Sequence, residues 1–572
     1  MLSRLATFCY RRRRWIVLAW LVLLVGISLL SNAAGKAFSQ DFKLANSDSQ
    51  KAFDVLAERF PGRSGLTGDI VFKADAGITD PGVQARLEAL FTEIKRVEGV
   101  VDVRTPYSGP MAAAQIAPSG NIGYAIIQFG GESSNEISRS TIAAIESLVA
   151  NARADDLQVE LGGFLFQERE PPGSEAIGLL AAVVILLVAF GSVLAMGLPI
   201  TTALFGIGVG FGVVNLLAHL TSVPEFSTQL AAMIGIGVGI DYALFIVTRY
   251  RQALADGLEP ETAVVTAIDT AGRAVLFAGC TVVISLAGML LIGIKFVQGL
   301  GLAAASVVAV TMVASVTLLP AVLGFVGRNI DRFAIPGLGK HAHGSRQGFW
   351  FRWSRLLQHH SWVAAVGGLV LLLGLATPVF SMRLGSSDES NLPETMTVRR
   401  AYDLKAEGFG AGASGPLLLV AELPDGVTPQ ALLPVLQAVQ ADPGVAQVAP
   451  PMPSPSGDAA IIQVIPTTSS QDEATIELIE RLRSEILPAA TEGTGITVHV
   501  GGVTALFEDL AVQLQRRLPV FIGVVLALSF LLLLVVFRSV LVPVKAVLMN
   551  LLSIGAAYGV VVAVFQWGWG CL

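Results

Sequence analysis

Long apolar runs alternate with two extended polar stretches along the chain. An α-helix needs about 20 apolar residues to cross the roughly 30 Å hydrocarbon layer of a membrane. Nine runs approach that length, so the pattern predicts a polytopic α-helical membrane protein with nine spanning helices. These runs begin near Trp15, Ala176, Ile200, Phe226, Ala274, Leu300, Trp362, Val520 and Val547.

The first run has an alternative interpretation. Four arginines at 11–14, an apolar stretch and the residues NAAG imitate a secretory signal peptide. The run from Trp15 to about Leu30 is long for a signal peptide, and a matching run begins at Trp362. We therefore favour a retained helix.

The two polar stretches, 35–172 and 383–516, show the same order of signals. Each begins with an amphipathic segment and continues with a strand, a helix, two strands, a helix and a last strand, as the periods of 3.6 and 2 indicate. The strands include TGDIVFKA and LQVELGG in the first stretch, and GPLLLVAEL and GITVHVGG in the second. Each stretch is predicted to form a small α/β domain.

The chain also contains an internal repeat. A shift of 347 positions places Trp15 on Trp362 and lays FGSVL (190–194) on FRSVL (537–541). Duplication of a helix, a polar domain and several further helices is a common plan for transporters. Gly208 and Gly212 fall on Gly555 and Gly559 under the same shift.

Basic residues gather at one end of the predicted spans, notably at 11–14, 249–251 and 329–361. Because basic loops stay in the cytoplasm, this end is predicted to be cytoplasmic, together with the N-terminus. Both α/β domains are then extracytoplasmic. The expected organisation is the first helix in 1–34, the first α/β domain in 35–172, a helix bundle in 173–328 with a cytoplasmic surface helix over 252–270, a basic cytoplasmic loop in 329–361, the seventh helix in 362–382, the second α/β domain in 383–516 and two helices in 517–572.

Composition excludes several classes of function. The chain is 53% hydrophobic and 14% charged, and its net charge of -6 gives no reason to expect a nucleic-acid partner. Its three cysteines lack metal-ligand spacing, no GxxxxGK[ST] motif indicates ATP binding, and no nucleophile and base are paired as in an enzyme. We expect no enzyme activity, no cofactor, no metal and no ATP, so any pumping needs another energy source.

A single acidic residue, Asp241, lies deep in the fourth run, in the sequence GIGVGIDYALFIVTRYR (235–251). It is about 10 Å from the cytoplasmic end at 1.5 Å per residue, where an ionised carboxylate costs about 2.5 to 3.5 kcal/mol. Close packing of small residues is expected to bury it within the bundle. The glycines expected around it are Gly235, Gly237 and Gly239 on the fourth run and Gly208 and Gly212 on the third.

Asp241 and Tyr242 lie about 100° apart around the helix, so each is expected to face partners on other helices. Ionisable residues within membranes usually mark ion pathways, and a buried carboxyl suits a group that loads and releases protons. The alternative is a structural Asp bonded to Asn215 or Thr281. Thr281 and Ser285, spaced i, i+4 on the fifth run, are further polar candidates, although such hydroxyls often bond their own backbone.

These residues resemble the MMPL group of resistance-nodulation-division (RND) transporters. The resemblance is carried by GIGVGIDYALFIVTRYR, by TAGRAVLF, by FRSVLVPVKAVLMNLLSIGAAYGVVV and by VFQWGWG. It implies twelve transmembrane helices in two repeats, each repeat with a ferredoxin-like porter domain outside the bacterial inner membrane. It also implies export of lipids or other hydrophobic molecules, driven by the proton gradient.

In the same resemblance, Asp241 and Tyr242 correspond to the first half of a proton relay, which a second Asp-Tyr pair in the tenth helix completes. That pair would fall near position 588, beyond Leu572, so we expect a family member truncated at its C-terminus. The expected partners are membrane lipids, an amphiphilic substrate and envelope-assembly proteins. The alternative functions are a non-transporting scaffold or lipid-sensing partner in envelope assembly, and an inactive truncated transporter.

Overall fold

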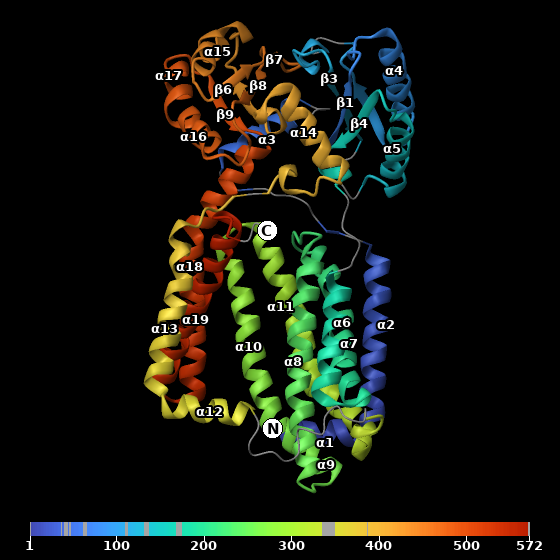
Figure 1. The fold of residues 1–572 in the computed structure, drawn as a ribbon, viewed down its shortest axis with the longest axis vertical. Coiled ribbons are helices and arrows are strands. Elements are labelled where there is room, and N and C mark those ends of the chain that lie inside the picture. The colour runs from blue at the N-terminus through green and yellow to red at the C-terminus, as the bar shows by residue number, and fades with distance from the viewer. Residues whose placement is uncertain are drawn as a thin grey trace. The chain divides into compact units, whose positions relative to one another are not determined.

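The computed structural model describes residues 2–35, 37–38, 44, 47–60, 66–108, 112–130, 136–167, 174–334, 349–385 and 387–569. The chain forms two units (Figure 1). We call the first the helical unit, which comprises Met1–Phe42, Pro171–Arg383 and Arg516–Leu572. The second, the sheet unit, comprises Lys43–Glu170 and Leu384–Gln515.

Eight helices of the described residues are long and apolar enough to cross a membrane. The second predicted run, which begins near Ala176, forms α6 (Ser174–Phe190), whose 17 residues span only about 26 Å. The prediction of nine full spans is therefore corrected to eight and a shorter apolar helix. The eight are α2 (Arg13–Ala34), α7 (Val193–Ala218), α8 (Ser227–Ala255), the segment Pro260–Ile292 with α10 (Arg273–Ala287), α11 (Lys295–Val326), α13 (Ser361–Ala376), α18 (Val503–Phe537) and α19 (Leu541–Val561).

The expected surface helix over 252–270 is not one helix. The spanning helix α8 continues to Ala255, and a turn then places Gly257 at a φ of 87°. That conformation favours glycine, and Pro260 starts α9 (Pro260–Ala267) at the position where its missing N–H costs nothing. α9 buries Ala263 and Val264 and joins α10 through a π-helical turn, Ile268–Gly272. The segment is thus a bent entry into the next span.

Two short amphipathic helices precede spans in the helical unit. α1 (Leu2–Arg11) comes directly before α2, and α12 (Phe349–His359) comes directly before α13. α12 lies in the region predicted as a basic loop, 329–361. The rest of that prediction falls partly on residues 335–348, which lie outside the described residues.

The sheet unit contains two antiparallel sheets with corresponding strand orders. In each sheet the strand that comes first in the chain is an inner strand, and it pairs with the strand that comes last (Figure 1). The first sheet has the order β2 (Val100–Arg104), β3 (Ile122–Phe129), β1 (Thr67–Ala74), β4 (Leu157–Gly162). The second has β6 (Val445–Val448), β8 (Ala459–Pro466), β5 (Leu417–Glu422), β9 (Thr497–Gly501), with β7 (Met452–Pro453) paired to β8.

On one face, each sheet packs against helices from its own segment of the chain. α4 (Pro81–Lys95) and α5 (Arg139–Ala152) share a buried core with the first sheet, through residues such as Leu87 and Ile145. The second core is built in the same way, with Val435 and Leu478 packed against the second sheet. Its helices are α15 (Leu433–Gln440), α16 (Glu473–Arg481) and α17 (Leu487–Thr491).

The two sheets exchange one helix each. α3 (Asp48–Arg59) precedes the first sheet in the chain but packs on the second, where Ala52 joins Val420 in one buried cluster. α14 (Thr397–Phe409) precedes the second sheet but packs on the first, where Ala401 joins Val71. The two halves of the sheet unit are therefore joined by reciprocal packing.

Matching hydrogen bonds fix both exchanged helices at their N-termini. The backbone N–H of Val500 in β9 donates to Asp48 Oδ2 at 2.8 Å. The backbone N–H of Leu161 in β4 donates to Thr397 Oγ1 at 2.9 Å. Thr397 also donates to Glu160 Oε2 at 2.7 Å. A polar side chain in the first turn of each helix thus satisfies a strand N–H that would otherwise lie unpaired.

Candidate functional site

Asp241 is exposed on a face of α8 that no described helix covers. Phe245, one turn away on this face, is 64% exposed, and Met233, two turns away, is 57% exposed. A Cβ at Gly237 would meet no atom within 4 Å. The expectation that the bundle buries Asp241 is therefore wrong for the described part of the chain.

The geometry of α8 explains this correction. Residues two positions apart on a helix differ by about 200°, so the row containing Gly235 and Gly239 lies opposite the row containing Gly237 and Asp241. A Cβ at Gly235 would lie 2.6 Å from Val307 of α11, and one at Gly239 would lie 3.0 Å from Ala203 of α7. The close helix packing is formed by the row that does not carry the carboxylate.

The glycines of α7 do not surround Asp241 either. A Cβ at Gly208 would lie 2.8 Å from Leu24 of α2, and Gly212 is in similarly close contact with Ile27 of α2. The expectation that these two glycines pack around the carboxylate is therefore corrected: they form the contact between α7 and α2. Which residues these glycines contact depends on which helices lie next to α7.

Tyr242 faces the interior of the helical unit. Its side chain is 7% exposed, and a Cβ at Gly279 of α10 would lie 3.3 Å from the Tyr242 ring. The buried hydroxyl has no hydrogen-bond partner among the described residues. Because an unsatisfied buried hydroxyl costs about 1–3 kcal/mol, this atom marks a place where a polar partner would be stabilising.

The polar partners considered from the sequence are engaged elsewhere. Asn215 donates to the Ser31 and Gly35 carbonyls at the end of α2, at 3.0 and 2.9 Å. Thr281 donates to the Phe277 carbonyl of its own helix at 2.9 Å, and Ser285 is half-buried on the same helix. Asn215 and Thr281 therefore give no support to the structural alternative for Asp241.

The arginines that end the motif do not neutralise Asp241. Arg251 binds Asp331 at 2.6 Å, and Arg249 donates to Gln252 at 3.2 Å. Within the part of the chain that the structure describes, Asp241 forms no hydrogen bond or ion pair. The site thus pairs an exposed carboxylate with a buried phenol that faces a different side of the same helix.

A second group of ionisable side chains, in the sheet unit, was not expected from the sequence. Lys405 of α14 binds Asp69 of β1 at 2.6 Å and lies 4.8 Å from the centre of the Tyr124 ring. Burial, with the nearby Asp69 carboxylate, raises the pKa of Glu389 to about 7. The residues come from three distant segments with no shared motif, so no sequence signal could have found the group.

Comparison with known proteins agrees with the organisation of the chain. The MMPL family profile matches residues 41–365 and 420–570. "Membrane protein YdfJ" of Bacillus subtilis is 34% identical over 99% of this chain and 77% of its own length. "Mycolic acid-containing lipids exporter MmpL11" of Mycolicibacterium smegmatis is 32% identical over 98% of this chain.

Another relative has a different printed activity. "Heme uptake protein MmpL11" of Mycobacterium tuberculosis is 28% identical over 98% of this chain. The chain spans 59% of that protein and 60% of the M. smegmatis protein. The family match and the identity to YdfJ over nearly the whole chain place this protein in the MMPL family of RND-type membrane transporters.

Proposed function

We propose that this protein exports a lipid or another hydrophobic molecule across the bacterial inner membrane, driven by the proton gradient, with Asp241 and Tyr242 as its proton relay. The observation that carries the proposal is a carboxylate in the middle of α8 that pairs with none of the described residues, on an exposed stripe that is otherwise apolar or small. A carboxylate in that position is costly in a membrane unless it is protonated or meets a polar partner. Its cost therefore depends on its protonation state, as a relay requires.

Protonation would change what Asp241 contacts. The ionised carboxylate favours a polar partner or water on the open face of α8, whereas the neutral acid tolerates close apolar packing. A proton that crosses 100 mV releases about 2.3 kcal/mol, enough to shift a two-state equilibrium about fiftyfold. The buried Tyr242 hydroxyl is the second group of the relay, because it has no hydrogen-bond partner among the described residues.

The finer architecture forms part of the same proposal. The sheet unit is placed outside the cytoplasm as two ferredoxin-like porter domains of an internally repeated chain. The N-terminus is then cytoplasmic. The corresponding strand orders of the two sheets and the exchanged helices α3 and α14 support this arrangement. No cofactor and no ATP take part.

The substrate class follows the printed names of the relatives. One MmpL11 protein is named as an exporter of mycolic acid-containing lipids, which supports an amphiphile as the cargo. Another is named for heme uptake, which supports inward movement of a flat hydrophobic molecule as the second candidate. Both candidate cargoes are amphiphiles, so the direction of transport distinguishes the two candidate functions.

The test compares two single substitutions on α8. Asp241→Asn removes the proposed proton carrier, and Asp256→Asn removes the same charge from the exposed end of the helix. The full-length protein is reconstituted in vesicles that contain a pH-sensitive dye, with a mycolic acid-containing lipid extract or haemin as the probe. Proton movement and probe distribution between the two sides are measured together.

We expect Asp241→Asn to reduce probe-dependent proton movement at least tenfold and Asp256→Asn to leave it within about twofold. Export without proton movement in the wild-type protein would contradict the coupling. Undiminished coupled transport by Asp241→Asn would contradict the relay. Absence of transport in all three proteins, together with retained envelope-lipid assembly in cells, would favour the scaffold instead.

A further inference from the structure

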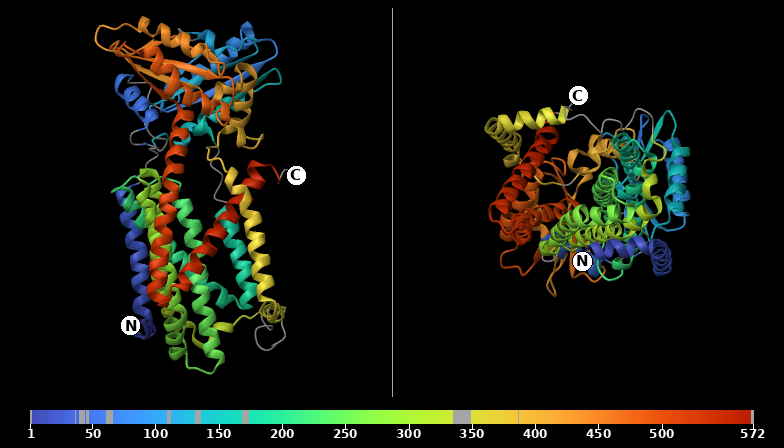
Figure 2. Two further views of the ribbon diagram at one scale, coloured as in Figure 1. Left: turned by 90° about the vertical axis from the view of Figure 1, so that its left-hand side faces the viewer. Right: turned by 90° about the horizontal axis from the view of Figure 1, so that it is seen from below.

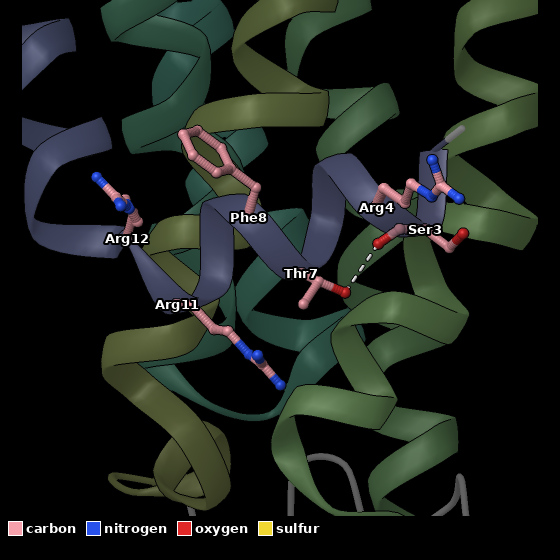
Figure 3. Close-up of a pocket in the computed structure, with 6 residues that line it drawn as sticks. All are labelled: Ser3, Arg4, Thr7, Phe8, Arg11 and Arg12. Atoms are coloured by element: carbon pink, nitrogen blue, oxygen red, sulfur yellow. Dashed lines mark hydrogen bonds between the residues drawn. The ribbon is translucent and has the colours of Figure 1, made fainter.

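The exposed face of α1 forms a basic groove (Figure 3). Two rows of side chains run along it at four-residue spacing, so members of each row are neighbours on the helix surface. The cavity between and beside them has a volume of about 420 Å³. One row is Ser3, Thr7 and Arg11, and the other is Arg4, Phe8 and Arg12.

The opposite face of α1 is buried, and this determines which side of the helix the groove occupies. Ala6 and Cys9 are 0% and 1% exposed, because α1 packs on α9 and α11. Arg13, just after the helix, stacks on the Tyr10 ring and donates to the Gly324 carbonyl of α11. Arg4, Phe8 and Arg12 therefore lie on the exposed side of α1, whereas Arg11 contacts Glu261 of α9.

Two of the three groove arginines have no acidic partner in the described part of the chain. Arg11 binds Glu261 of α9 at 2.8 Å. Arg4 and Arg12 form no ion pair with the described residues, and Arg12 instead stacks on the Phe8 ring at 5.9 Å. Figure 3 shows these two guanidinium groups at opposite ends of the groove, with Phe8 between them. The groove is thus positively charged and has an exposed aromatic ring.

Covalent connection places the groove at the membrane surface. Only one residue separates α1 from α2, and the adjacent Trp15 at the start of this span is 68% exposed. Aromatic side chains concentrate where a membrane meets water, and amphipathic helices with arginines lie in that layer. Phe8, on the helix that leads into this span, is also exposed, by 51%.

A second helix supports this placement. α12 precedes α13 in the way that α1 precedes α2, and both lie at the same end of the helical unit in the two side views (Figures 1 and 2). α12 carries exposed Phe351 and Trp353, and Arg355 stacks on Phe351 at 5.8 Å. Both helices thus bring aromatic rings and guanidinium groups to one plane.

We propose that the α1 groove binds the headgroups of anionic phospholipids. The guanidinium groups of Arg4 and Arg12 take lipid phosphates through paired N–H donors, and the Ser3 and Thr7 hydroxyls contact the glycerol region. Phe8 packs against the first acyl carbons. The site anchors the beginning of α2 in the leaflet that α1 meets, and it is independent of the relay at Asp241.

Simple attraction of basic residues to a charged membrane is the competing explanation, because it also places arginines beside spans. It depends on the number of charges and not on their position around the helix. Arg14 is a matched control for this reason. It is exposed, lies two residues from Arg12 and does not line the groove.

The test is native mass spectrometry of the delipidated full-length protein, titrated with dioleoyl phosphatidylglycerol or dioleoyl phosphatidylcholine. We expect the wild type to bind phosphatidylglycerol preferentially. Arg4→Gln with Arg12→Gln should weaken this binding about tenfold or more, as loss of two guanidinium contacts implies. Arg14→Gln should change it less than twofold.

Equal weakening by Arg14→Gln, or equal binding of both lipids, would overturn the proposal. Displacement of the lipid by 10 mM inorganic phosphate would show a site for free anions and would overturn it too. Arg4→Lys with Arg12→Lys separates folding from binding, because it keeps the charge and should retain part of the lipid preference. A cysteine introduced in a soluble loop should be equally accessible to labelling in every variant, which would show that the membrane topology is unchanged.

Discussion

Gly501 of β9 and Ala52 of α3 are in such close contact that a Cβ at position 501 would lie 2.6 Å from the Ala52 Cβ. The corresponding contact in the other half is looser: a Cβ at Gly162 of β4 would lie 3.3 Å from the Ala401 Cβ of α14. In both places a glycine near the end of a strand allows an exchanged helix to lie directly on the sheet. The exchange therefore depends on the absence of a side chain.

Gly501→Ala should loosen α3 from the second sheet more than Gly162→Ala loosens α14 from the first. Overpacking of a close contact costs about 1–3 kcal/mol, and the 2.6 Å contact leaves less room than the 3.3 Å contact. Hydrogen exchange of β5, β9 and α3 in the full-length protein would measure the local opening free energy. A larger effect from Gly162→Ala would show that the two contacts have been ranked wrongly.

The ionisable group in the sheet unit predicts a pH dependence of stability. The pKa of Glu389 is raised to about 7 in the folded protein, so the folded state holds a proton that the unfolded state releases near its ordinary value of about 4.3. The folded state is then favoured at low pH, and its stability falls as the pH rises from about 4.5 to about 7. Above pH 7 this loss is complete.

Glu389→Gln should remove that dependence, because the amide stays neutral at every pH. The region around Lys405 should become more protected by about 3 kcal/mol at pH 8 and remain unchanged at pH 4. Hydrogen exchange of α14, corrected for the intrinsic rate at each pH, measures this difference. Glu394→Gln, which changes an exposed acid five residues away, is the control. A parallel pH profile for Glu389→Gln and the wild type would contradict the assignment.

The two glycine rows of α8 predict opposite responses to the same substitution. Gly239→Leu should destabilise the helical unit by about 1–3 kcal/mol or more, because Ala203 lies 3.0 Å from the new Cβ. Gly237→Leu should leave its stability nearly unchanged, because that position has no neighbour within 4 Å. Thermal unfolding in detergent compares the two variants directly. Equal loss from both would show that the Asp241 face is covered in the intact protein.

Much of the fold is readable from local patterns. Apolar length indicated the spanning helices, and alternation indicated the strands of both sheets, because each signal resides within a single element. The shortness of α6 and the bend between α8 and α10 depend on where the apolar runs are interrupted, at Gly257 and Pro260 for example. These details appear only when the backbone conformation is known.

The site was predictable in its residue types and not in its surroundings. Asp241 was recognisable because a carboxylate is rare within an apolar run, but its exposure depends on which neighbours α8 has on each side. The separation of the Gly235 and Gly237 rows follows from the helix period and could have been drawn from the sequence. The exchange of α3 and α14 could not, since an amphipathic helix buries its apolar face equally well on either of two similar sheets.

The exchange of helices constrains how the protein is made. The first sheet ends at Gly162, yet α14, which covers part of it, begins at Thr397. At translation rates of about 5–20 residues per second, the ribosome needs on the order of 10–50 s to supply the roughly 235 residues between them. During that time the nascent first sheet exposes Val71 and Ile122 without their helix. Biogenesis therefore needs either a chaperone that shields this surface or a pause in folding until the second half emerges.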